Sequence, residues 1–235
     1  MKKIMTMFLI SFICFPNLFA NDFNVGIGLV VPLGASISKK NQTFNADADK
    51  NDGVLSGDKS AFEFGVGLTP GFYKGFNDFM GFSIALDFGY KREVFSYNQT
   101  KKNSNSQYET IDTIYYFDTI NIGLLPKFNV ASFFIGIGGG VKWVVNGVEK
   151  TKNYGENAVQ LKSIYIPYVK ATFDYLFLFT DEMALGIGLY AGYDFGPHIM
   201  DSRFSKNILS AFDIGGQISF YFVNDWFYIW FIKKI

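Results

Sequence analysis

The sequence predicts an all-β fold: a transmembrane, antiparallel up-and-down β-barrel of eight strands, with a polar, glycine-rich lumen and an apolar, aromatic exterior. Three observations predict it. Apolar residues alternate with small or polar ones, aromatic residues make up 19% of the 235-residue chain, and short connections alternate with long ones. A period of two is typical of β-strands, because successive side chains point to opposite faces of a sheet.

The N-terminus predicts export. A basic head, Lys2 and Lys3, precedes a short apolar stretch, and the small residue Ala20 ends it. These are the parts of a secretory signal peptide, here residues 1–20, that is cleaved after export. The alternative is a retained anchor, but the apolar run is short for a membrane span. Cleavage would also remove Cys14, the only cysteine, and leave no disulfide framework.

Charge and hydropathy exclude two classes of protein. Lysine and arginine total 21, as do aspartate and glutamate, so the chain lacks the basic footprint of a nucleic-acid-binding protein. Beyond the leader, no uninterrupted apolar run approaches the roughly 18 residues of a transmembrane helix. A chain this apolar is therefore expected to meet the membrane with strands.

The alternation predicts eight strands. In residues 81–90, for example, large apolar side chains alternate with glycine, serine, alanine and aspartate. Glycine pairs of the form Gly-apolar-Gly recur in phase within the strands, which suits a narrow interior, and no helix follows them as a phosphate loop would require. The predicted strands are 23–35, 61–73, 80–95, 111–127, 131–145, 162–177, 183–196 and 209–223.

The connections between these strands alternate in length. Tight turns are predicted at 74–78, 128–130 and 178–182, and long polar loops lie near 38–60, 96–110, 146–161 and 197–208. Short turns at one end and long loops at the other are typical of bacterial outer-membrane barrels. We therefore predict one barrel domain over residues 21–223.

The charged residues indicate which face of the sheet is wet. They are in phase with the glycines, whereas the opposite face is almost entirely Phe, Ile, Leu, Val and Tyr. A soluble ligand-carrying barrel would need the reverse arrangement. The predicted lumen charge network consists of Glu63, Asp87, Lys127, Lys142, Lys170, Asp174, Asp194 and Asp213, with Lys91 near the outer rim.

This network has two interpretations. It could line an ion path, or it could be a salt-bridged plug, because buried charge must be paired. We favour the plug, since side chains just fill the interior of an eight-stranded barrel. Outside, Tyr116, Trp143 and Tyr175 are expected near the strand ends, in the aromatic girdles at the membrane interfaces.

With its signal peptide, alternating strands, loop pattern and final Gln-Ile-Ser-Phe-Tyr-Phe, the chain resembles the small outer-membrane barrels of the OmpA transmembrane domain, OmpX and Ail type over about residues 22–223. The resemblance implies the outer membrane of a diderm bacterium, contact with lipopolysaccharide-like lipids, and insertion by the barrel assembly machinery. That group usually ends at its C-terminal aromatic residue, whereas the matching Phe222 is internal here.

Within the last twelve residues, 224–235, the stretch Trp226–Ile232 is apolar on both faces, unlike the eight strands. A ninth strand would make the strand number odd. We expect an aromatic tail at the membrane interface instead.

Two loop segments contain candidate site residues. His198, beside Asp201 and Ser202, has residue types that lipid-A-modifying barrels resembling this one use, but no catalytic spacing accompanies it. Asp47, Asp49 and Asn51 approach a calcium loop, yet the glycine that the pattern requires is missing, so a solvated loop is expected. No catalytic residue, metal site or cofactor is predicted.

The sequence therefore favours a non-enzymatic membrane barrel whose surface loops mediate adhesion or contact host or envelope macromolecules, because binding residues concentrate on loops held by a rigid scaffold. A narrow pore is the alternative, and a lipid-A-modifying enzyme a weaker one. No nucleic acid partner is expected.

Overall fold

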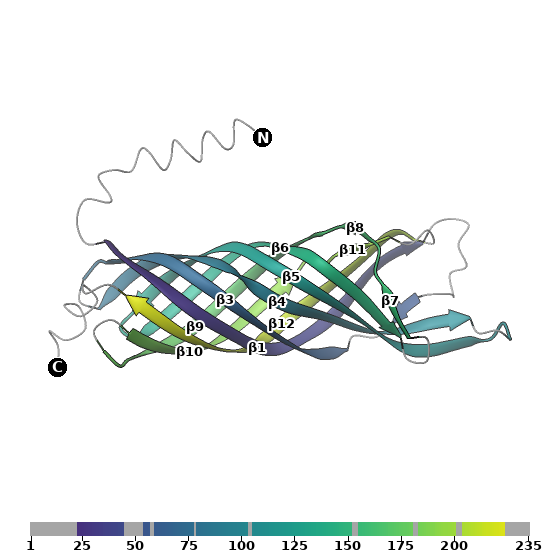
Figure 1. Cartoon of the computed structure of the whole chain (residues 1–235), viewed down its shortest axis with the longest axis horizontal. Coiled ribbons are helices and arrows are strands. Elements are labelled where there is room, and N and C mark those ends of the chain that lie inside the picture. The colour runs from purple at the N-terminus through teal and green to yellow at the C-terminus, as the bar shows by residue number, and fades with distance from the viewer. Residues whose placement is uncertain are drawn as a thin grey trace, which may run out of the picture.

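The structure is a computed structural model, which describes residues 23–44, 54–56, 59–77, 79–102, 105–151, 155–180, 183–200 and 204–223. Among the described residues, no helix is long and apolar enough to cross a membrane. The elements, shown in Figure 1, are β1 (Phe23–Phe44), β2 (Val54–Ser56), β3 (Ser60–Gly75), β4 (Met80–Lys102), β5 (Tyr108–Val130), β6 (Phe133–Thr151), β7 (Gly155–Ala158), β8 (Leu161–Ser163), β9 (Tyr165–Leu178), β10 (Met183–Asp194), β11 (His198–Ile199) and β12 (Phe204–Val223).

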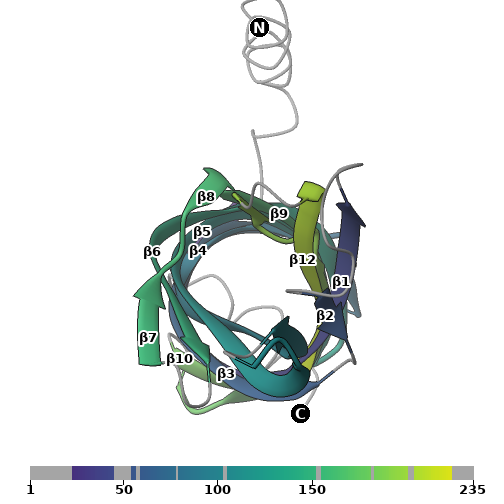
Figure 2. The same cartoon turned by 90° about the vertical axis from the view of Figure 1, so that its right-hand side faces the viewer.

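The eight long strands form a closed ring. They pair in the order β1-β3-β4-β5-β6-β9-β10-β12, and β12 pairs antiparallel with β1, from Gly26↔Val223 to Phe44↔Phe204. Figure 2 looks along the barrel and shows the strands arranged around its axis. Closure leaves no long strand of the ring with a free edge inside a membrane. The predicted eight-stranded antiparallel barrel is confirmed.

The two faces of the ring differ as the alternation predicted. Outward side chains such as Ile137 and Leu189 are large, apolar and exposed, and this holds for all eight long strands. Inward side chains such as Thr119 and Asn129 are polar and buried. An apolar surface of this extent is stable against lipid rather than water, so the ring is built to span a membrane.

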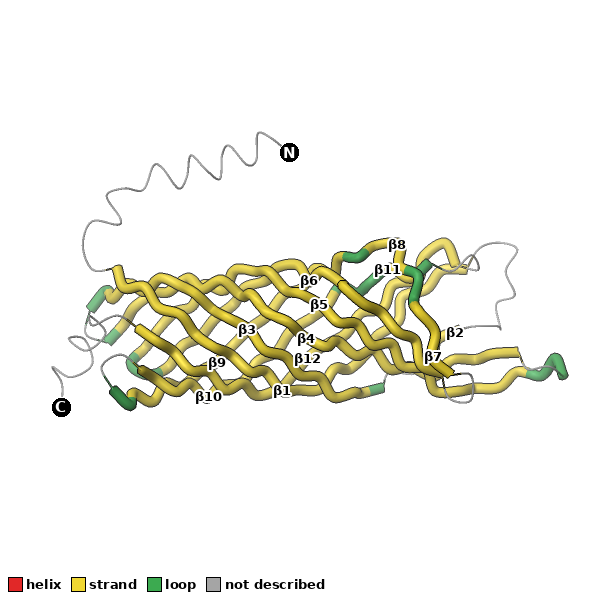
Figure 3. The backbone as a smooth tube through the Cα atoms, in the orientation of Figure 1, coloured by secondary structure: helices red, strands yellow, loops and turns green. Residues whose placement is uncertain are grey.

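Six of the eight long strands are longer than predicted, whereas β9 and β10 are two residues shorter. β4 and β5 have 23 residues each and pair as far as Lys102↔Tyr108, well inside the range predicted as a loop. The short strands β2, β7 and β11 fall within the predicted outer loops, and β8 lies at the boundary between the loop 146–161 and the strand predicted to begin at residue 162. Above the membrane both faces of a strand can be polar, so the alternation ends while the hydrogen-bond ladder continues. Figure 3 shows these extensions at the end of the barrel where β2 and β7 lie.

The short turns at the other end depend on local capping. Asn77 Oδ1 accepts hydrogen bonds from the amides of Phe79 and Met80, both at 2.8 Å. The turn predicted at 128–130 is wrong: β5 continues to Val130, and the chain reverses at Ala131, whose φ is 50°. Phe128 and Val130 continue the alternation of β5, which places the reversal two residues later.

β4 leaves β3 in the outer half of the barrel. Their ladder ends at Phe64↔Arg92, and the next five residues of β4, 93–97, are all buried. The amide of Ser96 donates to Ser38 Oγ at 2.8 Å, and Tyr97 Oη donates to the carbonyl oxygen of Lys39 at 2.9 Å. This part of β4 therefore turns inward toward β1 and narrows the outer mouth.

Candidate functional site

The charged side chains of the lumen form two groups. The first, here called the upper charge cluster, contains Lys91 and Lys142 with four acids. Lys91 Nζ lies 2.9 Å from Glu63, 3.0 Å from Asp213 and 3.3 Å from Glu93. Lys142 Nζ lies 2.6 Å from both Glu93 and Asp194. The cluster consists of Glu63, Lys91, Glu93, Lys142, Asp194 and Asp213.

The second group, the lower charge pairs, lies closer to the short turns. Lys127 Nζ lies 2.8 Å from Asp174 Oδ2, while Gln217 donates to the other oxygen of Asp174 at 2.5 Å. Lys170 Nζ lies 3.6 Å from Asp87, which also accepts a 2.8 Å hydrogen bond from Tyr168 Oη. Each lysine here is matched by one acid.

Apolar layers close the charged zone from both ends. The outer apolar layer is built of Phe95, Tyr97, Tyr115, Phe117, Val144, Ile166, Ile199, Leu209 and Ala211, with Val159 and Leu161 against it. The inner apolar layer is built of Tyr73, Phe134 and Leu176, with Leu178 and Tyr221. Two cavities, of about 50 Å³ and 80 Å³, lie among the lumen side chains. They have room for a few water molecules each.

All eight side chains predicted for the lumen point inward, and strand parity alone placed them there. The structure adds the division into two groups. Lys91 was predicted near the outer rim, but it lies at the centre of the upper charge cluster, in contact with three acids. Glu93 was missed, although it follows Lys91 in the same phase. This end of the strand was predicted to lie at the outer rim of the barrel. A charged side chain exposed to solvent there needs no ion-pair partner, so Glu93 was not assigned to the network.

The residues considered for a lipid-A-modifying site are only partly described. His198 belongs to β11 and pairs with Ile208 and Ser163. Partial burial and the nearby lysines 162 and 206 hold the pKa of His198 below its usual value. Asp201 and Ser202 lie outside the described residues, as do Asp47, Asp49 and Asn51 of the calcium-like loop, the signal peptide and the tail 224–235.

The aromatic residues predicted for the girdles occupy both ends of the barrel wall. Trp143 is half exposed and its ring lies 6.3 Å from that of Tyr165. Tyr175, near the short turns, packs edge-on against Phe133 at 4.9 Å. Tyr116 lies under the guanidinium of Arg92 at 5.3 Å. Aromatic rings near the strand ends are expected where a barrel meets the headgroups.

A closed antiparallel ring with an apolar exterior, a polar lumen, short turns at one end and long strand extensions at the other defines an outer-membrane β-barrel. No family model matches the chain, and no curated protein matches it.

Among solved structures, the chain is similar to Neisserial surface protein A at 13% identity, over 84% of this chain and 95% of that one, with a TM-score of 0.36. It is similar to the outer membrane protease OmpT from Escherichia coli at 9% identity, over 87% and 99%, with a TM-score of 0.42. For Ail, the attachment invasion locus protein of Yersinia pestis, the identity is 11%, the coverage 83% and 99%, and the TM-score 0.34. Similarity this low carries no argument about function.

Proposed function

We propose that the protein is a non-enzymatic display barrel: a membrane scaffold that holds strand-built projections outside the cell for adhesion to host or envelope macromolecules. The observation that carries this proposal is the contrast between the two parts of the molecule. The lumen holds clustered charged side chains between apolar layers, whereas the outer end carries the long β4–β5 hairpin, whose side chains near Tyr108 are exposed. Binding residues concentrate in such projections of a rigid scaffold.

The outer projections have charged surfaces suited to polar macromolecules. Lys59 and Asp112 form an exposed ion pair at 2.5 Å, and Lys150 pairs with Glu156 of β7 at 2.9 Å. Exposed ion pairs contribute little to stability, about 0–1 kcal/mol each, so these side chains are available to exchange partners. All four residues of β7 are exposed.

Shortening the longest hairpin tests display. Replacing residues 99–111 with an Asn-Gly turn should abolish adherence of expressing cells to epithelial monolayers, because it removes the β4–β5 projection. The ring should still fold, since β4 and β5 pair below this point as far as Met80↔Val130. Adherence counts give the first readout and the heat-modifiable shift of the folded barrel on gels gives the second. Normal adherence by this variant, and by variants with the other outer connections replaced, would sink the display proposal.

The pore alternative has a separate test. The purified barrel is expected to give no conductance steps in a planar bilayer, because the buried rings of the outer apolar layer occupy the path of a hydrated ion. A variant with Phe95→Ala and Phe117→Ala removes two of its fully buried rings and is the comparison. Regular conductance steps from the unmodified barrel would contradict the display proposal and support a transport function.

A further inference from the structure

The upper charge cluster carries more negative than positive charge. Each lower charge pair is neutral, whereas the cluster has four carboxylates and only two ammonium groups, Lys91 and Lys142. All four acids, Glu63, Glu93, Asp194 and Asp213, are 3% exposed or less. Two uncompensated charges in a site bounded by apolar layers are costly, so either a bound cation or protons on the carboxyl groups must offset them.

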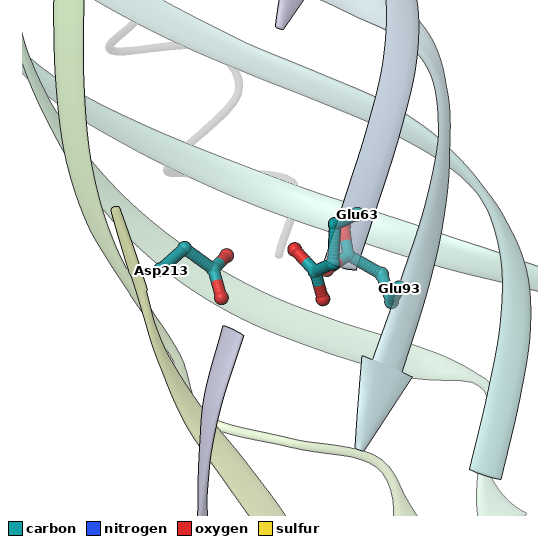
Figure 4. A group of neighbouring side chains, drawn as sticks. All are labelled: Glu63, Glu93 and Asp213. Carbon is teal, nitrogen blue, oxygen red and sulfur yellow. The ribbon is translucent and has the colours of Figure 1, made fainter. Parts of the chain in front are cut away.

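The acids converge on a common space. Oxygen atoms of Glu63, Glu93 and Asp213 all lie within 4.8 Å of one another, and Figure 4 shows the side chains of Glu63 and Asp213 directed toward each other, with Glu93 beside them. Lys91 Nζ contacts one oxygen of each of these acids, at 2.9 Å to 3.3 Å. Asp213 Oδ2 accepts a hydrogen bond from Lys91 Nζ. Asp213 Oδ1 is buried and has no hydrogen-bond partner among the described residues.

Two buried hydroxyl groups beside these acids also lack a hydrogen-bond partner among the described residues: Ser36 Oγ and Tyr190 Oη. Ser36 is 0% exposed and lies directly opposite Asp213 in the β1–β12 ladder. Tyr190 is 5% exposed and its hydroxyl covers the inner face of Gly34, whose partner in β3 is Glu63. Buried hydroxyls are normally bonded, so both point to a ligand in this space.

We propose that the upper charge cluster binds one Ca²⁺ ion, with Asp213, its neighbouring acids and the hydroxyls of Ser36 and Tyr190 as the available oxygen donors. These donors are all oxygen atoms, with carboxylates, which Ca²⁺ prefers, in the majority, and Ca²⁺ tolerates irregular geometry where Mg²⁺ requires a near-ideal octahedron. A divalent ion also makes the cluster neutral: four carboxylates are then balanced by Lys91, Lys142 and Ca²⁺.

The test uses the full mature chain, refolded in detergent, stripped with EDTA and titrated with Ca²⁺ by calorimetry. We expect one Ca²⁺ ion to bind per barrel. With Ca²⁺ bound, the folded gel band should be lost at a higher temperature than in the EDTA-stripped barrel. Tyr190→Phe should weaken Ca²⁺ binding by about tenfold, as removing a supporting donor typically does. Asp213→Asn should abolish binding, and Tyr190→Phe keeps the test decisive if Asp213→Asn does not fold.

Two controls locate the ion. Asp174→Asn changes a lower charge pair and should leave the Ca²⁺ affinity unaltered. Asp47→Asn with Asp49→Asn removes acids of the calcium-like loop and should also leave it unaltered.

Loss of binding in the loop variant, or equal loss in Asp174→Asn, would overturn the proposal. So would a barrel that binds no Ca²⁺ and is insensitive to EDTA, because protons on the carboxyl groups would then supply the missing charge.

Discussion

Replacing Lys91 with methionine is expected to lower the free energy of unfolding by about 3–5 kcal/mol, the cost of removing one partner from a buried ion pair. Lys91 Nζ contacts Glu63, Glu93 and Asp213, and its removal leaves four buried acids with Lys142 as their only ammonium partner in the cluster. Urea unfolding of the refolded barrel, followed by tryptophan fluorescence and by the folded gel band, measures the change.

Two variants define what this result means. Lys206→Met removes an exposed lysine of β12 and should change the free energy of unfolding by less than about 0.5 kcal/mol. The double variant Lys91→Met with Asp213→Asn should be more stable than Lys91→Met alone, since it also removes one of the stranded carboxylates. Equal stabilities for Lys91→Met and Lys206→Met would show that the upper charge cluster does not depend on its central lysine.

Gly196→Ala is expected to lower the free energy of unfolding by about 2–5 kcal/mol. Gly196 has φ 61°, a left-handed conformation that costs other residues about 1–2 kcal/mol. A Cβ there would also collide with the carbonyl group of Leu209, a fully buried residue of the outer apolar layer, and relieving such overpacking costs about 1–3 kcal/mol. The urea midpoint at constant slope measures the loss.

Gly155 is the matched control for this substitution. Its φ is 82°, so an alanine there is strained in the same way, but an added Cβ would meet nothing within 4 Å. Gly155→Ala should therefore cost only the backbone strain, about 1–2 kcal/mol. If both variants lose the same stability, the contact with Leu209 contributes nothing, and the outer apolar layer is looser than the structure indicates.

The parts of the fold that follow from strand parity could be predicted from the sequence. In 81–90 the alternation assigns every side chain to lipid or lumen, and the same holds for the eight predicted lumen charges, because a one-residue slip would bury aromatic rings and expose charge to lipid. The turn at Asn77 was also predicted, since its side chain caps the turn locally.

Features that depend on contacts between distant strands could not be predicted. The inward turn of β4 rests on Ser96 meeting Ser38 and on Tyr97 reaching Lys39, and residues so far apart in the chain leave no periodic signal. Glu93, by contrast, shares the phase of Lys91 and was missed only because that end of β4 was predicted to lie at the outer rim. The outer extensions were predicted as loops because their polar residues lack alternation, although the ladder of β4 and β5 continues to Lys102↔Tyr108.

The length of β4 and β5 determines how far their hairpin extends beyond the membrane. Each has 23 residues, of which roughly 9–11 cross the hydrocarbon core. Up to about a dozen remain, and at about 3.3 Å per residue and a tilt of about 40° they rise roughly 30 Å above it. A hairpin of that height can pass through a crowded carbohydrate coat, so its tip would meet a large partner before the membrane does.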